Sequence, residues 1–250
     1  GGNNGMSTTD AGYRYGYNRN QQDVLMYSFL AAYSGRSPSD VNTNMFPSIP
    51  AINWNVTYDG LRNIGIFKKL LRNFVISHGY RSTYSITGFM NNQRFVENDA
   101  VPGFTDVIDT TQNFVSQYIL QNVSIIEAFS PLINFDMTWK NSLTTKIEVK
   151  KNRNVGMNFQ NNQLTENSTM EYIIGVGYKI EKLRLPIIVA GKRLENDMNI
   201  RLDIGVRDNK TIVRKIPDAN AVGEQQQITA GQQNITIKFF VDYAVSKTIN

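Results

Sequence analysis

The sequence lacks most features that point directly to a chemistry. It has no cysteine and one histidine in 250 residues, so it lacks thiolate zinc ligands and a disulfide scaffold. The single histidine, His78, shares its alternation with Phe74, Ile76 and Tyr80, which favours a packed side chain over a catalytic one. No complete nucleotide-binding loop is present. We therefore expect no enzymatic activity, no cofactor, no metal and no nucleic-acid partner.

Long apolar runs are also absent, since none approaches the ~18 residues that a membrane helix requires. What the sequence does contain is strict alternation between residues 133 and 245. Six runs place 28 positions on one side, of which 27 are apolar, Thr145 being the exception, and none is charged. Because side chains alternate along a strand, these runs predict sheets with one apolar face and one polar face.

Two sets of candidate residues follow from this alternation. The residues expected to face lipid are Ile133, Phe135, Met137, Trp139, Ile147, Ile174, Val176, Leu202, Ile204, Ile237, Phe239 and Val241. The residues expected to face a water-filled lumen are Asn134, Asp136, Thr138, Lys140, Thr144, Lys146, Glu148, Lys150, Glu171, Lys179, Arg201, Asp203, Arg207, Lys238 and Asp242. The second set carries both signs, which is typical of a hydrated wall rather than of a selective binding site.

The length of the runs favours a membrane wall over a soluble sandwich. The runs 170–180 and 235–245 each span eleven residues, close to the ~9–11 of a membrane strand, whereas soluble strands cluster near ~5–6. Trp139, Phe159, Tyr178 and Tyr243 lie near run ends, where aromatic rings would occupy the membrane interface. We predict an all-β fold: the wall of an antiparallel transmembrane β-barrel, with one or two short helices near the N-terminus.

The chain divides into a loop and short helical segment over 1–50 and transmembrane strands over 51–250. A helix is predicted over 22–33, ending at Gly35, and Ser37-Pro38-Ser39-Asp40 is typical of a second helix start. After a strand over 52–58, Asp59 is a candidate cap for a basic amphipathic segment. That segment either lies at a membrane surface or is a connector packed on the barrel rim.

We expect eleven to thirteen strands in total. Short hairpin connections are predicted at 140–142 and 150–154, and longer ones at 91–112, 161–167, 183–195 and 216–233. Both ends of the chain look cut, since Gly1-Gly2-Asn3-Asn4-Gly5 is typical of a loop interior and residue 250 closely follows a strand. We therefore expect a segment of a very large barrel.

Several segments resemble the SprA (Sov) family, the giant outer-membrane translocons of the Bacteroidetes type IX secretion system. The similar stretches are Phe29–Gly35, Pro50–Leu61, Ser77–Ser85, Glu127–Ile133 and Ile174–Ile180. They occur in one order across residues 22–250 and are similar to the C-terminal portion of such proteins. The resemblance rests on the order and spacing of these stretches, each of which has low specificity alone.

The resemblance implies a function in the bacterial outer membrane. Members of this family form a single-chain barrel that conducts folded cargo proteins, and in gliding species they export motility adhesins. The implied partners are the rest of the same barrel chain, a PorV-like lateral-gate barrel, a periplasmic plug protein, secreted cargo and outer-membrane lipid. Two alternatives stay open: a smaller complete porin or transporter, and a soluble β-sandwich adhesin or binding module.

Overall fold

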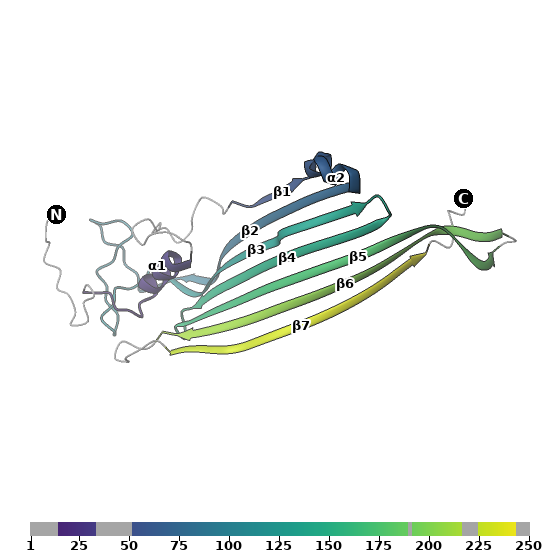
Figure 1. Cartoon of the computed structure of the whole chain (residues 1–250). Coiled ribbons are helices and arrows are strands. Elements are labelled where there is room, and N and C mark those ends of the chain that lie inside the picture. Colours follow the sequence, from purple (N-terminus) through teal and green to yellow (C-terminus); the bar gives the residue numbers. More distant parts are fainter. Residues whose placement is uncertain (1–14, 34–51, 190–191, 217–224, 244–250) are drawn as a thin grey trace.

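The fold is a single antiparallel sheet of seven strands in sequence order (Figure 1). This computed structural model describes residues 15–33, 52–189, 192–216 and 225–243. The strands are β1 (Trp54–Tyr58), β2 (Leu71–Asn91), β3 (Tyr118–Trp139), β4 (Leu143–Asn158), β5 (Gln163–Val189), β6 (Lys192–Lys215) and β7 (Gln225–Tyr243). The helical segments are α1 (Gln22–Tyr33), a 3-10 turn η2 (Gly60–Asn63) and α2 (Gly65–Leu70). The prediction of an all-β antiparallel fold is confirmed.

The strands are longer and fewer than predicted. Strands β2 to β7 contain between 16 and 27 residues each, and seven strands lie within the described residues instead of eleven to thirteen. The predicted hairpin at 150–154 is wrong because β4 runs through it without a break. Residues 163–167, predicted as loop, belong to β5, and most of 183–195 belongs to β5 and β6.

Polar composition caused these errors. Two of the stretches taken for loops, 150–154 and 161–167, are rich in Asn, which usually favours turns over strands. In the sheet these residues face one another: Asn154 lies opposite Asn167, and Asn152 lies opposite Thr169. The connection at 140–142 is confirmed, with Ser142 in the left-handed region (φ 67°) that a tight hairpin requires.

Helix α1 is confirmed over 22–33 and is held to the sheet at its first residue. The Gln22 side chain donates from Nε2 to the carbonyl of Tyr118 (2.8 Å) and accepts from the backbone N–H of Leu120 (2.8 Å). β4 ends before it reaches these two backbone groups of β3. The Gln22 side-chain amide therefore makes the hydrogen bonds that a neighbouring strand would make. The predicted stop at Gly35 and the helix start at residues 37–40 lie outside the described residues.

The basic amphipathic segment predicted after Asp59 forms η2 and α2, which lie beside the hairpin between β3 and β4. Asp59 precedes it, but its side chain makes no capping hydrogen bond to η2. Lys140 Nζ donates to the carbonyl of Lys68 (2.8 Å), and Arg72 Nη2 donates to the carbonyl of Lys140 (3.1 Å). α2 is therefore tied to the end of the sheet opposite α1, as Figure 1 shows.

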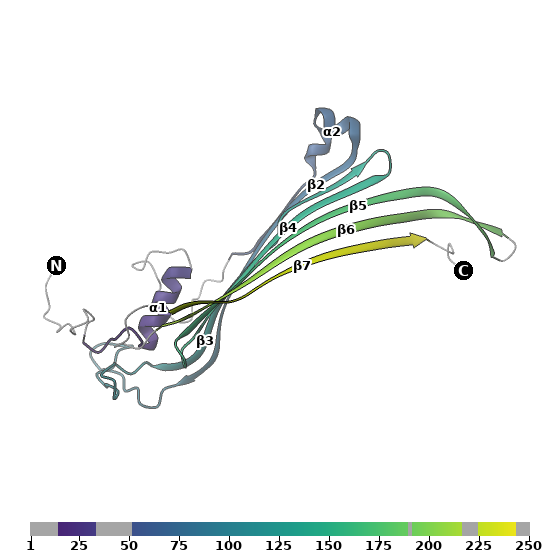
Figure 2. The same cartoon turned by 60° about the horizontal axis from the view of Figure 1, so that its bottom comes forward.

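The sheet twists and bends along its length. Figure 2 shows α1 beside one end of the strands and α2 beside the other, with a marked change of direction between them. The register of β2 against β3 shifts between Ser77 and Arg81, and that of β3 against β4 shifts between Phe129 and Ile133. Such irregularities increase local twist. No helix within the described residues has the length and apolarity needed to cross a membrane.

Candidate membrane-facing and channel-facing surfaces

Strand pairing assembles one continuous apolar face from the predicted runs. Phe135 lies opposite Ile147, and Ile147 lies opposite Ile174. The series continues from Ile174 to Ile204 and from Ile204 to Ile237. Directly opposed residues share a face, so the register brings all twelve residues of the first predicted set to one side of the sheet. That this side meets lipid stays a prediction.

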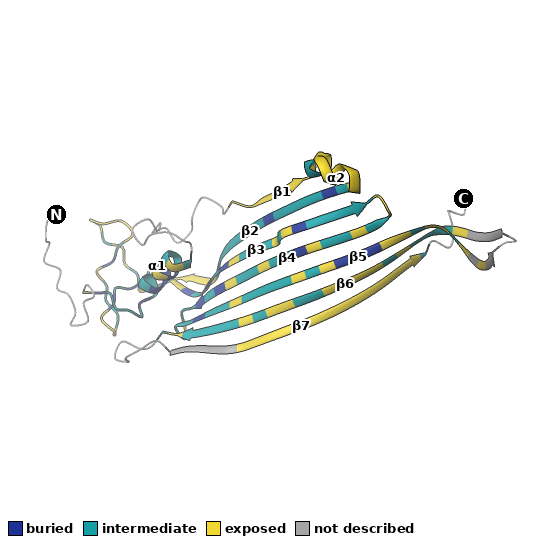
Figure 3. Cartoon of the chain, viewed as in Figure 1, coloured by how far each residue is buried: buried dark blue, intermediate teal, exposed yellow. Residues whose placement is uncertain are grey.

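The apolar face is open to its surroundings. Ile174 is 55% exposed, Ile237 is 67% exposed and Phe239 is 64% exposed. Figure 3 shows the exposed residues recurring along β5 and β6 and over most of β7. Within the described residues, no second sheet or helix layer covers these side chains. A continuous exposed apolar surface across several strands is typical of a face that meets a partner or lipid.

The one polar residue within the predicted apolar runs, Thr145, has its hydrogen bond satisfied locally. Thr145 lies opposite Met137, and its hydroxyl accepts a hydrogen bond from the indole Nε1 of Trp139 (3.0 Å). Both polar groups are thereby paired to each other, which removes the cost of leaving them unsatisfied in an apolar medium.

Aromatic rings lie at both margins of the apolar region. At the margin nearer α1, the rings of Trp54 and Tyr80 are 4.4 Å apart, and those of Tyr80 and Phe129 are 4.8 Å apart. At the margin nearer α2 stands Trp139, in β3 at the start of the hairpin. Two aromatic rims are typical of transmembrane barrels. Phe159 belongs to neither rim, because it packs against the cluster beneath α1, and its predicted interfacial place is wrong.

We define the apolar band as the apolar residues between these two rims. On β5 it runs from Met170 to Ile180, which is ten residue steps or ~33 Å of strand. With the ~40° tilt of strands in membrane barrels, the height becomes ~25 Å, the usual height of a lipid-facing band.

The opposite face is polar and its charges are largely paired. Lys146 and Lys150 both reach Glu148 (3.1 and 3.6 Å), and Lys150 also approaches Glu171 (3.9 Å). Arg201 pairs with Asp203 at 2.8 Å. Asn134 and Glu148 on this face are only 6% and 8% exposed. This arrangement neutralises the surface without concentrating one sign of charge.

The remaining members of the second predicted set lie on or near this polar face. Asp136 accepts a hydrogen bond from the Asn134 amide (2.6 Å), and Lys179 pairs with Asp197 (2.7 Å). The register places Thr138, Thr144, Arg207, Lys238 and Asp242 on the same side. Lys140 is the exception, because it lies in the hairpin and its ammonium turns to the Lys68 carbonyl.

A belt of charge crosses the apolar face beyond the band, and sequence reasoning missed it. We define this ionic belt as Glu127, Lys151, Arg153, Glu166, Asp208, Lys210 and Arg214. The unbroken register from Ile147 to Val155 along β4 keeps Lys151 and Arg153 on the apolar face. The signal was present: both residues stay in phase with Val149 and Val155 once the supposed hairpin at 150–154 is removed.

Arg153 is the centre of the ionic belt. It contacts Glu166 through Nε (2.8 Å) and Glu127 through Nη1 (3.4 Å), and Arg214 also reaches Glu166 (3.2 Å). The guanidinium of Arg153 lies 5.2 Å from the ring centre of Tyr33, whose hydroxyl accepts from Arg214 (2.9 Å). The last residue of α1 therefore sits directly on the belt.

Beyond the belt, α1 covers the same face of the sheet. Met26 and Phe29 pack with Val155, Met157 and other buried residues of β3 to β5. Val155 and Met157 are 1% and 2% exposed, in contrast to their counterparts in the band. One face of the sheet thus passes from an uncovered apolar band, through an ionic belt, to a helix-covered core.

His78 is a packed residue, as its alternation predicted. Its Nδ1 lies 2.6 Å from the carbonyl oxygen of Leu132, and its ring lies near those of Trp54 and Phe129. Among the residues that the structure describes, no group of three or more His, Cys, Asp or Glu side chains is arranged to hold a metal ion.

Comparison with models of known protein families gives no match, and comparison with curated proteins gives none either.

Proposed function

We propose that this chain forms part of the wall of a protein-conducting channel in a bacterial outer membrane. The observation that carries the proposal is the apolar band: ~25 Å tall, free of charge and without a covering layer in the described part of the chain. Lipid is the environment in which such a face is stable, because there it needs no protein partner. The opposite face then borders the water-filled lumen.

The polar face supports a conduit rather than a selective pore. Cations and carboxylates of both signs are interspersed on it, and many of them form ion pairs, so passing cargo would meet little unbalanced charge. A pore selective for a solute needs a ring of one sign or a constriction. The resemblance to the SprA (Sov) translocons of type IX secretion adds the nature of the cargo, namely folded secreted proteins, adhesins of gliding motility among them.

In this proposal the sheet is completed by further strands of its own barrel chain. Within the described residues, β1 and β7 each pair on one side only, and a spanning sheet requires a neighbour on both. A PorV-like lateral-gate barrel and a periplasmic plug protein are the partners proposed by the same resemblance.

Site-directed labelling tests the assignment of the two faces. The 250 residues contain no cysteine, so single cysteines can be placed at Phe135, Ile147 or Ile237 and matched with their neighbours Asp136, Lys146 or Lys238. In native outer membranes, we expect a lipid-soluble maleimide to modify the first group and a charged, impermeant maleimide to modify the second. Reversed labelling would overturn the proposal. Equal aqueous labelling of both groups would favour a soluble sandwich.

A further inference from the structure

The ionic belt is only partly neutralised by its own members. Two arginines and two glutamates form its ion pairs, with Arg153 between Glu127 and Glu166, and Arg214 on Glu166. Among the described residues, Lys151, Lys210 and Asp208 make no ion pair. All three are exposed. The belt has four cations against three carboxylates, and its unpaired charges are two lysines and one aspartate.

Both lysines stand at the edge of the apolar band on the same face of the sheet, Lys151 level with its last residue and Lys210 just beyond it. Lys151 lies opposite Met170, the last band residue of β5, and Lys210 lies opposite Ser168, two residues further along β5. A lysine at this position can lay its four-carbon stem along apolar surface and extend its ammonium into the polar zone. The ammonium groups therefore reach the level of lipid headgroups.

The position of the lysines on the sheet favours a shared ligand. Lys151 and Lys210 lie two strands and two residues apart, which separates their Cα atoms by ~12 Å. Asp208 lies directly opposite Met170 on β6, two residues from Lys210, and Arg153 is already engaged by two carboxylates. The two exposed lysines outnumber this one exposed carboxylate, so an anion at the belt would meet a net positive charge.

We propose that Lys151 and Lys210 bind phosphate groups of lipid headgroups and so fix the depth of the wall in the membrane. This inference rests on the proposed function. The leaflet is the outer one, because this end of the sheet carries the long connection over residues 92–117, whereas the other end carries the short hairpin at 140–142. The occupant is a phosphorylated glycolipid of that leaflet. Lysine binds phosphate as a point charge, which suits a ligand that is laterally mobile.

The test compares two double variants in the protein as it is extracted from outer membranes in detergent. Lys151→Gln with Lys210→Gln removes two charges from the belt. Lys146→Gln with Lys238→Gln removes the same charge from the polar face and serves as the matched control. Binding of diphosphoryl lipid A in nanodiscs is measured for both, with phosphatidylcholine nanodiscs as the uncharged reference.

We expect the belt variant to lose about tenfold to thirtyfold in affinity for diphosphoryl lipid A, with unchanged binding to phosphatidylcholine. The control variant should bind both as the unmodified protein does. Equal losses in the two variants, or no loss in the belt variant, would overturn the inference. Inorganic phosphate should not displace the lipid; displacement would assign the lysines to a soluble anion and overturn it too.

The cysteine labelling described above separates this inference from the function on which it rests. If Ile147 and Ile237 label from the lipid phase while the belt variant retains its lipid, the membrane wall stands and the headgroup site fails. If those positions label only from water, the membrane wall itself fails. Heat-modifiable migration of the belt variant on gels would show that its barrel still assembles.

Discussion

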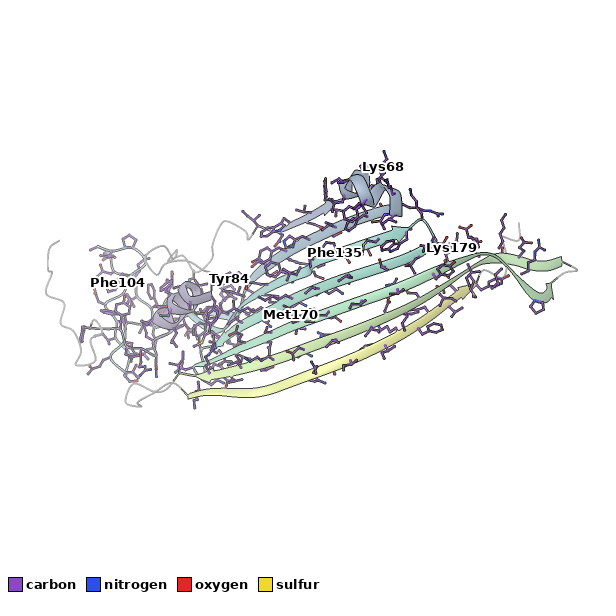
Figure 4. The ribbon with its side chains drawn as sticks, in the orientation of Figure 1. Lys68, Tyr84, Phe104, Phe135, Met170 and Lys179 are labelled. Atoms are coloured by element: carbon purple, nitrogen blue, oxygen red, sulfur yellow. The ribbon has the colours of Figure 1, made fainter. Side chains whose placement is uncertain are left out.

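At the two ends of one sheet face, apolar side chains differ in whether a second layer covers them. In the apolar band, Ile174 and Ile237 are more than half exposed, and in the described residues nothing covers them. At the other end of the same strands, Val155 and Met157 are buried beneath α1. Figure 4 shows the separation, with Phe135 on the band and Tyr84 close to α1.

In the proposed function, this difference reflects a change of solvent along the strands. Burying one Val, Ile or Met side chain away from water stabilises a protein by ~1.5–3 kcal/mol, so an uncovered row of such residues is unfavourable in water. The described residues supply a helix as cover at the α1 end and no cover over the band. The ionic belt lies between the two regions, where a membrane boundary would allow charged groups to be hydrated.

Truncating Phe29, the buried side chain that packs α1 onto the sheet, should have the largest effect on stability. We expect Phe29→Ala to weaken the docking of α1 by about 3–5 kcal/mol, because Phe29 is buried in the cluster with Met157 and Leu164. Hydrogen exchange of the α1 amides should become faster by at least two orders of magnitude, since each 1.4 kcal/mol is a factor of ten.

The neighbouring exposed residue supplies the control for this change. Ser28→Ala should leave exchange in α1 unchanged, since Ser28 is exposed. Lipid-phase labelling at Ile237 should be the same in both variants. Full protection of α1 in the Phe29→Ala variant would show that the helix does not depend on this face, and the contrast between the two regions would be lost.

Charge placed in the band should have the next largest effect. Ile237 and Thr236 are neighbours on β7, on opposite faces and both exposed. Ile237→Lys should cost about 2–4 kcal/mol if the residue lies near the middle of a bilayer, whereas Thr236→Lys points into water and faces Gly205, where there is room. Folding into lipid vesicles, followed by urea titration, measures the difference.

Equal stability of the two lysine variants is the outcome that contradicts a lipid-facing band. A soluble sheet would accept lysine at Ile237 with little cost because the site is 67% exposed. The comparison is strong because both variants carry the same new charge on the same strand.

The sequence predicted the faces of the sheet better than the lengths of its strands. Alternation placed Ile147, Ile174 and Ile204 on one side because a two-residue period is a direct consequence of strand geometry. It failed at 150–154, where Lys-Lys-Asn-Arg-Asn resembles a turn. Whether such a stretch turns or continues depends on pairing with β5, which is a long-range contact that local composition does not encode.

The place of α1 was also beyond the reach of the sequence. The sequence predicted its bounds, which are confirmed. What it covers is decided by contacts such as Gln22 with the β3 backbone, nearly one hundred residues away along the chain. The ionic belt could have been foreseen in part, since Lys151 and Arg153 keep the phase of their run, but their partners Glu127 and Glu166 come from other strands.

A half-buried carboxyl in α1, that of Asp23, gives the smallest expected effect and refines the contrast between the two ends. Burial raises the pKa of Asp23, against hydrogen bonds from Ser116 (2.9 Å) and Gln22 that lower it. Because the folded state holds this proton more tightly than the unfolded state, the stability of α1 docking falls as pH rises from the ordinary carboxyl pKa to the raised one.

Asp23→Asn removes this loss of stability and can keep the Ser116 hydrogen bond. We expect proteolysis within α1 to slow by about twofold at neutral pH, with no difference from the unmodified protein in acid below the ordinary carboxyl pKa. A variant that is cleaved faster at neutral pH would show that the ionised carboxyl stabilises the docked helix.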